Sequence, residues 1–157
     1  MRRPLCHKRP SRVRLPPPPL REVEHVAHLV LASLLPALAA ADIDAFGAAL
    51  TRIQDVTGRW FAPVQGGAFA PGPSEALVRR MDEWGAAGVG QSSWGPAVYG
   101  VVAGRDAAVR LADRVRGFLD GGGTVYEGAF PTQGARVWVG TPDDAVDAAG
   151  GWDDPDA

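Results

Sequence analysis

Residues 85–100 combine glycines, serines and a glutamine in a pattern that could bind an anion. The polar and glycine positions of interest are Gly90, Gln91, Ser92, Ser93 and Gly95. Glycine lets the backbone approach a ligand closely. Consecutive backbone N–H groups in such a turn form a concavity for anions, and serine hydroxyls add donors to it. The pattern favours a phosphate or pyrophosphate ligand. A tight hairpin that needs glycine for packing alone is the alternative, and it stays open.

A second group of chemically capable residues lies at residues 58–67, which we expect to form a loop between two helices. Arg59 could pair with a carboxylate or phosphate through two parallel hydrogen bonds. Gln65 could hydrogen-bond a substrate, and Gly66 permits close approach of a ligand. Phe61, with the tryptophan before it, would be an unusual residue to leave exposed in a loop. These aromatic rings either contact the substrate or fill the core beneath the loop.

The sequence gives less evidence for any other catalytic or metal-binding group of residues. His25 and His28 lie one helical turn apart, a spacing that can support metal binding, but no third ligand is apparent nearby. A capping or core role is therefore favoured for both. No Ser–His–Asp arrangement, catalytic carboxylate pair or dinucleotide-binding fingerprint can be placed in the sequence.

The N-terminal half of the chain predicts helices that would hold these segments. From Arg21 apolar residues recur at steps of three and four, as on the buried side of a helix, and Pro36 should bend or end this helix. Asp42 can cap a second helix over residues 43–56, which Thr57 and Gly58 should close.

A third helix begins behind Pro73, and we expect Ser74 to be its N-cap and Gly85 its stop. Its inward residues should be apolar at helical spacing. They are Leu77, Val78 and Met81.

The C-terminal half predicts strands as well. Residues 86–91 and 97–102 read as two strands around the glycine turn, followed by a helix over 105–119. Residues 124–130 and 135–139 read as two further strands. This order predicts an α+β fold, with helices packed on a mostly antiparallel sheet.

Charge and composition define the ends of the predicted domain. Residues 1–14 carry only basic charges and predict a disordered leader, whereas residues 141–157 carry only acidic charges and predict a disordered tail. Between them, residues 15–140 form the expected domain. The net charge is −2, and the middle has no basic stripe to follow a phosphate backbone, so we expect no nucleic-acid partner.

The single cysteine, Cys6, cannot form an internal disulfide, which fits a reducing cytoplasm. The longest apolar stretch, residues 25–41, contains a histidine, a serine and a proline and is short for a bilayer span. No signal peptide is convincing. We therefore expect a cytoplasmic protein that does not enter a membrane.

The two segments together resemble a known family. Residues 88–100, with the sequence GVGQSSWGPAVYG, resemble the third conserved motif of the GHMP-kinase superfamily. Together with residues 58–67, GRWFAPVQGG, they are similar to the beta-ribofuranosylaminobenzene 5'-phosphate synthases of that superfamily. The resemblance covers residues 15–139 and corresponds to the C-terminal portion of those enzymes.

This resemblance implies a GHMP-type fold and a pentosyltransferase. Its substrates would be phosphoribosyl pyrophosphate and 4-aminobenzoate or 4-hydroxybenzoate, with loss of CO2 and pyrophosphate in methanopterin biosynthesis. Mg2+ would enter with the pyrophosphate. The phosphate side of the site would be Gly90, Gln91, Ser92, Ser93 and Gly95. The substrate side would be Arg59, Phe61, Gln65 and Gly66.

The chain departs from the family pattern in one respect. GHMP proteins carry their main phosphate-binding loop, rich in Gly and Ser, in an N-terminal domain, and nothing in this sequence matches it. We therefore expect the chain to be inactive alone. The product of a truncated or frameshifted gene is the favoured explanation, and a homodimer or a separately encoded N-terminal half is the alternative. An ATP-dependent GHMP kinase domain and a non-catalytic binding module derived from one are the alternatives.

Overall fold

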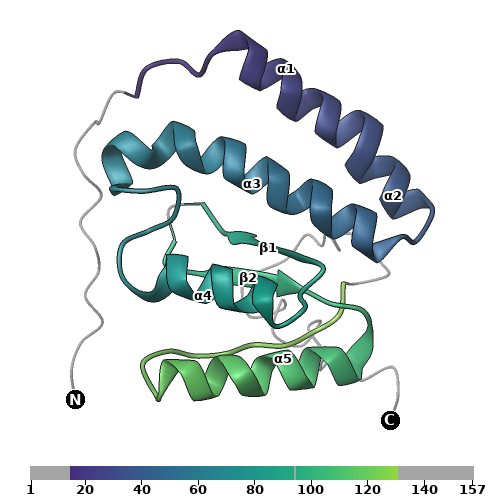
Figure 1. Cartoon of the computed structure of the whole chain (residues 1–157), viewed down its shortest axis with the longest axis vertical. Helices are drawn as coiled ribbons and strands as arrows, with labels where there is room; N and C mark the ends of the chain where they lie inside the picture. Colours follow the sequence, from purple (N-terminus) through teal and green to yellow (C-terminus); the bar gives the residue numbers. More distant parts are fainter. Residues whose placement is uncertain (1–14, 94, 131–157) are drawn as a thin grey trace, which may run out of the picture.

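The computed structural model describes residues 15–93 and 95–130. The predicted basic leader, the acidic tail and the predicted strand at 135–139 lie outside these residues. The elements follow in the order α1 (Leu20–Leu29), the π-helical turn η1 (Val30–Leu34), α2 (Leu35–Ala39), α3 (Ile43–Gln65), α4 (Pro73–Glu83), β1 (Gly88–Gln91), β2 (Val98–Val101) and α5 (Gly104–Leu119). The fold is α+β with helices packed on an antiparallel pair of strands, as the sequence predicts (Figure 1).

The first helix passes through Pro36 instead of ending there. Proline has no N–H for the carbonyl four residues back, and its ring crowds that carbonyl. The preceding turn, η1, is widened to π-helical geometry, and the amide of Leu35 donates to the carbonyl of Val30. Single π turns are a known way to absorb such a disruption inside a helix. Pro36 thus does not end the helix; it changes the hydrogen-bonding pattern of the turn before it.

The continuous helix Leu20–Ala39 is also longer than the apolar stretch seen in the sequence. Its 20 residues have a mean hydropathy of 1.3, which is long and apolar enough to cross a membrane when judged by length and composition alone. Core helices and signal sequences meet the same criterion. Only 6% of its most apolar window is buried within the described structure. The helix is therefore long enough for a bilayer span, although the apolar stretch at residues 25–41 is by itself short for one.

Helix α3 begins where the sequence predicts and ends nine residues later than the predicted 56. The Asp42 side chain accepts a hydrogen bond from the amide of Ala45 at 2.9 Å, which confirms the N-cap. Thr57 does not break the helix, because its hydroxyl donates to the carbonyl of Ile53 one turn back. The stop is Gly66, which has a left-handed φ of 87° and an amide that donates to Ala62.

Helix α4 differs from the sequence prediction at its start. Gly72 is the N-cap, with a φ of 102°, and Pro73 follows in the first turn. Ser74, the predicted cap, lies inside the helix and is buried. The predicted inward residues of this helix are buried, and Gly85 ends it with a φ of 91°.

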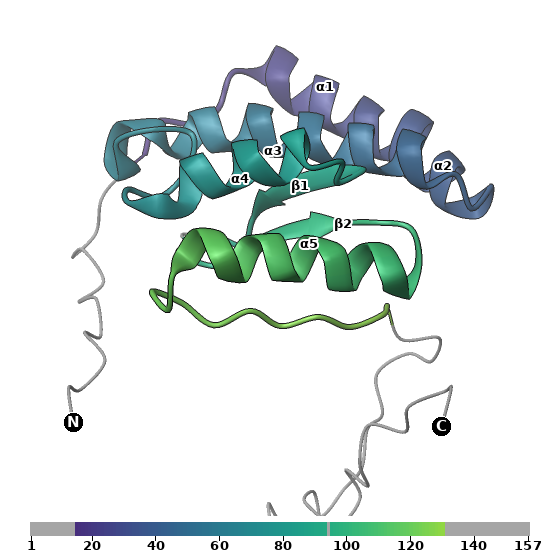
Figure 2. The ribbon, with the colours of Figure 1, turned by 60° about the horizontal axis from the view of Figure 1, so that its bottom comes forward.

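The two strands form an antiparallel hairpin that α4 and α5 cover on one face. The register runs from Gly88 opposite Val101 to Gln91 opposite Val98. Figures 1 and 2 show α4 and α5 beside the strands, with α1 and α2 on the far side of α3. The core between the hairpin and its helices contains Leu77, Val78, Met81, Ala86, Val89, Leu111 and Val115.

The third predicted strand does not form. Residues 124–130 have no regular secondary structure, because no described segment offers them a ladder of hydrogen bonds. They run back along α5 in an extended path (Figure 2). Glu127 pairs with Arg116 of that helix at 2.7 Å, and Val125 packs against the core.

Helix α3 covers the outer edge of β1, and this contact fixes the position of the helix relative to the strands. Two amides of β1 point away from β2 toward α3. The amide of Val89 donates to the hydroxyl of Thr51 at 3.0 Å, and that of Gln91 donates to the side-chain oxygen of Gln54 at 3.1 Å. The helix comes this close because Gly47 has no side chain: a Cβ there would lie 2.0 Å from the carbonyl oxygen of Ala87.

Candidate functional site

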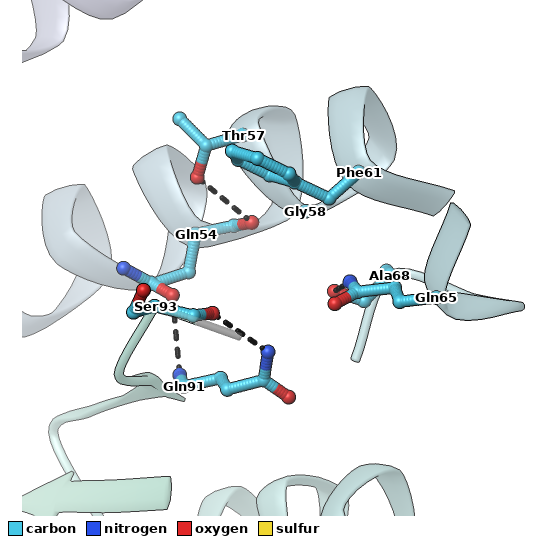
Figure 3. Close-up of a pocket in the computed structure, with 8 residues that line it drawn as sticks. All are labelled: Gln54, Thr57, Gly58, Phe61, Gln65, Ala68, Gln91 and Ser93. Atoms are coloured by element: carbon cyan, nitrogen blue, oxygen red, sulfur yellow. Dashed lines mark hydrogen bonds between the residues drawn. The ribbon is translucent and has the colours of Figure 1, made fainter. Parts of the chain in front are cut away.

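A small cavity lies where the second half of α3, the loop behind it and the end of β1 meet. Its volume is about 100 Å3. The residues that line it are Gln54, Thr57, Gly58, Phe61, Gln65, Ala68, Gln91 and Ser93. Figure 3 shows that these side chains come from both segments singled out in the sequence. The fold therefore brings the aromatic segment at 58–67 and the glycine turn at 88–100 to one place.

One wall of the cavity is a single face of α3. Gln54, Thr57, Phe61 and Gln65 follow one another at helical steps of three and four, so their side chains lie on the same side. The sequence prediction does not include Thr57, because the helix is expected to end at residue 56, and it does not single out Gln54 within the predicted helix. The spacing from Gln54 to Gln65 was the signal that would have found them.

Gln91 holds the other wall together. It is 6% exposed, and its side-chain oxygen accepts a hydrogen bond from the amide of Ala70 at 2.6 Å. Its side-chain nitrogen donates to the carbonyl of Ser93 at 3.0 Å. One N–H of that nitrogen remains for a ligand, since an amide has two. Gln91 thus joins the loop after α3 to the glycine turn. One N–H of its side-chain amide takes no part in these two hydrogen bonds.

The glycine turn uses part of its own hydrogen-bonding capacity. The amide of Ser92 donates to Ala97 at 2.9 Å, and the amide of Gly95 donates to Ser92 at 3.0 Å. These two amides close the turn and so are already engaged. Both serines are exposed, but of the two only Ser93 lines the cavity. The hydroxyls are therefore the donors of this turn that face solvent.

The glycines of this segment serve close packing. A Cβ at Gly90 would lie 2.5 Å from the hydroxyl of Tyr99, and one at Gly95 would lie 2.8 Å from the Cβ of Ala70. Burial raises the pKa of the Tyr99 phenol above its ordinary value, because the charged form would lose hydration. The contacts at Gly90 and Gly95 therefore support the alternative that this turn needs glycine for close packing.

The substrate-side residues divide into two groups. Phe61 and Gln65 line the cavity, and Gly66 caps α3 beside them. Arg59 lies on α3 with its side chain exposed and is not among the lining residues. Arg59, Phe61 and Gln65 lie on the helix instead of in the predicted loop, whereas Gly66 lies at the start of the loop.

Trp60, the other aromatic residue of this segment, has a structural role. Its indole N–H donates to the carboxylate of Glu22, which lies on α1. This contact joins α1 to α3 through two residues that are 38 positions apart in sequence. Trp60 does not line the cavity. Of the two aromatic rings, only Phe61 is in place to contact a ligand there.

The cavity has no charged side chain among its lining residues. Its polar groups are amides and hydroxyls. Within residues 15–93 and 95–130, no group of three or more His, Cys, Asp and Glu side chains is close enough to hold a metal ion. Mg2+ prefers carboxylates and phosphate oxygens. The described lining residues therefore do not fit a protein-held Mg2+ site.

Comparison with known proteins places most of the described residues in one family. The family described as GHMP kinases C terminal matches residues 34–121, more than half of the chain. Among curated proteins, the chain is similar to a beta-ribofuranosylphenol 5'-phosphate synthase of Methanothermobacter thermautotrophicus. The two are 39% identical over 85 residues, which are 54% of this chain and 25% of the relative.

A protein of the same name from Archaeoglobus fulgidus is 36% identical over 85 residues, which are 54% of this chain and 24% of the relative. No solved structure matches the chain. The matched part thus spans about a quarter of each relative's length. The family match includes α3, the hairpin and the cavity between them. This chain belongs to the family of GHMP kinase C-terminal domains.

Proposed function

We propose that this chain supplies the C-terminal part of the substrate site of a synthase that joins phosphoribosyl pyrophosphate to 4-hydroxybenzoate or 4-aminobenzoate. In this reaction a bond forms between ribose C1 and the ring carbon that carried the carboxylate. Pyrophosphate leaves C1 with its electron pair. CO2 leaves the ring, and the electron pair of the broken bond restores aromaticity, so no further reactant is needed. The product would serve methanopterin biosynthesis.

One observation carries this proposal: the two segments that resemble the synthases line a single cavity. Phe61 and Gln65 face Gln91 and Ser93 across it. The names of the two similar proteins add support, because both are called beta-ribofuranosylphenol 5'-phosphate synthase. A ring could contact Phe61 while a phosphate at the mouth meets the exposed hydroxyls of the turn.

The proposed roles follow from these positions. Ser92 and Ser93 would donate to phosphate oxygens, with Gln91 positioning the turn. Phe61 and Gln65 would contact the aromatic substrate. Arg59 would reach a carboxylate only from outside the cavity, where its side chain now lies. Mg2+ would be bound by the phosphates of the substrate.

We also propose a cytoplasmic location, supported by the single cysteine of the sequence. The chain would need a further domain, in a partner or in a second copy, to complete the reaction. The part of each relative that this chain matches is about a quarter of that relative's length, so the complete reaction is not proposed for this domain by itself. Binding rather than turnover is therefore the measurement to make on this chain alone.

Calorimetric titration tests the proposal. We expect the chain to bind 4-hydroxybenzoate and phosphoribosyl pyrophosphate, the second in the presence of Mg2+, without turnover. Ser93→Ala should weaken the pyrophosphate ligand about tenfold, the usual effect of losing a hydrogen bond to a charged group, and should leave the benzoate unchanged. Absence of heat with both ligands, at concentrations well above those of ordinary metabolites, would rule the proposal out.

A further inference from the structure

Gln65 presents a buried acceptor for which the described residues supply no partner. It lies in the last turn of α3, and its side chain extends into the cavity opposite Gln91 and Ser93 (Figure 3). Its nitrogen donates to the carbonyl of Ala68 at 2.9 Å. Its oxygen, Oε1, is buried and accepts no hydrogen bond from any described residue.

The orientation of this amide is fixed by the contact with Ala68. Exchanging the nitrogen and oxygen would set two carbonyl oxygens against each other, so Oε1 must be the atom left over. A buried acceptor without a partner costs about 1–3 kcal/mol. Such atoms are rare in native structures, and each one calls for an explanation. A ligand that donates to Oε1 would remove this cost.

On the α3 wall, the hydroxyl of Thr57 favours the same kind of ligand, whereas the donors of Gln91 and Ser93 lie on the opposite wall. The Thr57 hydroxyl gives its proton to the carbonyl of Ile53 and so turns lone pairs outward. The lining residues carry no positive charge that would offset an anion. A carboxylate or phosphate oxygen beside the buried Oε1 of Gln65 would meet an acceptor that has no proton to offer, which is unfavourable.

The size of the cavity limits what enters it. Pockets that enclose a whole small molecule measure roughly 300–1,000 Å3. This one, at about 100 Å3, can take one group of a ligand. The remainder of the ligand would lie outside, toward the exposed serines of the turn.

We propose that the cavity is a subsite for an uncharged O–H or N–H donor, and that Gln65 Oε1 is the acceptor that selects it. The inference rests on the proposed function, in which this donor is the substituent opposite the carboxylate of the benzoate. The hydroxyl enters the cavity, and the carbon at which the new bond forms points outward. The word phenol in the names of both relatives fits such a group.

Phenol and toluene are suitable probes, since they differ only by a hydroxyl in place of a methyl group. Their dissociation constants are measured by NMR titration with the natural chain and with Gln65→Met and Gln65→Glu. The quantity compared is the dissociation constant of toluene divided by that of phenol, measured for each variant. The two probes differ in their hydration, but this difference is the same for every variant and cancels in the comparison.

Gln65→Met should lower this ratio about tenfold, because a thioether is a weak acceptor. Gln65→Glu should keep it, since it loses the donation to Ala68 but retains acceptor oxygens. Arg52→Ala is the matched control: Arg52 is exposed on the same helix away from the cavity, and the ratio should not change. Unfolding midpoints check that every variant is folded.

An unchanged ratio in Gln65→Met, or no binding of phenol, would overturn the inference. The same samples are titrated with 4-hydroxybenzoate and benzoate. Loss of the phenol preference in Gln65→Met, without binding of either benzoate, would keep the inference and reject the proposed synthase. Equal binding of the two benzoates with an unchanged phenol ratio would reject the inference and keep the synthase.

Discussion

At the scale of single residues, the two glutamines of the cavity differ in how many of their side-chain hydrogen-bonding groups are already used by the protein. Gln91 is nearly fully occupied, because its oxygen serves Ala70 and its nitrogen serves Ser93. Gln65 has the same side chain and uses only its nitrogen. The sequence places the two residues on opposite sides of the site, and in the structure Gln91 joins the two walls while Gln65 lines the cavity.

Gln91→Met should therefore destabilise the fold. The change keeps side-chain volume but leaves the buried amide of Ala70 without an acceptor, at a cost of about 1–3 kcal/mol. Urea unfolding measures the free energy of unfolding. Ser92→Ala serves as the control, because its side chain is exposed, and it should change stability by no more than about 0.5 kcal/mol. Equal stability of Gln91→Met and the natural chain would contradict this role.

At the scale of elements, the position of the site depends on how closely α3 approaches β1. Thr51 and Gln54 accept hydrogen bonds from the two β1 amides that β2 cannot reach. These bonds satisfy an exposed strand edge. They also fix the helix along the strand, so that Phe61 and Gln65 reach the level of the glycine turn.

Gly47→Ala tests this contact. The added methyl group would lie 2.0 Å from the carbonyl oxygen of Ala87, so the helix must move off the strand. We expect a loss of about 1–3 kcal/mol, the usual cost of overpacking, despite the better helix propensity of alanine. The observable is the midpoint of urea unfolding.

Gly117→Ala is the matched control on α5. A Cβ at this position meets nothing within 4 Å, so the variant should gain about 0.5–1 kcal/mol from helix propensity. If both glycine variants shift the midpoint in the same direction, the close approach of α3 to β1 is not what Gly47 serves.

At the scale of the whole molecule, the Leu20–Ala39 helix leaves apolar surface in contact with solvent. Leu31 is 67% exposed and Leu38 is 60% exposed. Trp60 ties the start of this helix to α3 through Glu22, so the helix is held against α3 while its outer side stays bare. Contiguous apolar surface of this kind promotes association.

The isolated chain should therefore self-associate at micromolar concentration. Replacing Leu31 and Leu38 together by lysine should shift the population toward monomer, as measured by light scattering coupled to size-exclusion chromatography. Val109→Lys, on exposed apolar surface of α5, should have no such effect. A natural chain that stays monomeric would show that the exposed helix face does not drive association.

The sequence by itself determined the elements that local chemistry controls. Asp42 capped its helix, Gly85 ended another, and the two strands around the turn formed in the predicted places, because caps, stops and alternation act over a few residues. It also placed the chain in its family, since the two motifs are short and specific.

Tertiary contacts decided the rest. Gly58 looked like a helix stop, but it lies inside α3, where the carbonyl of Ala68 packs against it at a distance that only glycine permits. That extension moved Phe61 and Gln65 from a loop onto a helix face and added Thr57 to the same face of the cavity. Sequence periodicity reports which residues share a face, whereas packing against distant segments decides where a helix ends and which polar atom is left without a partner. The unpaired oxygen of Gln65 is a product of that packing, and no local pattern in the sequence indicates it.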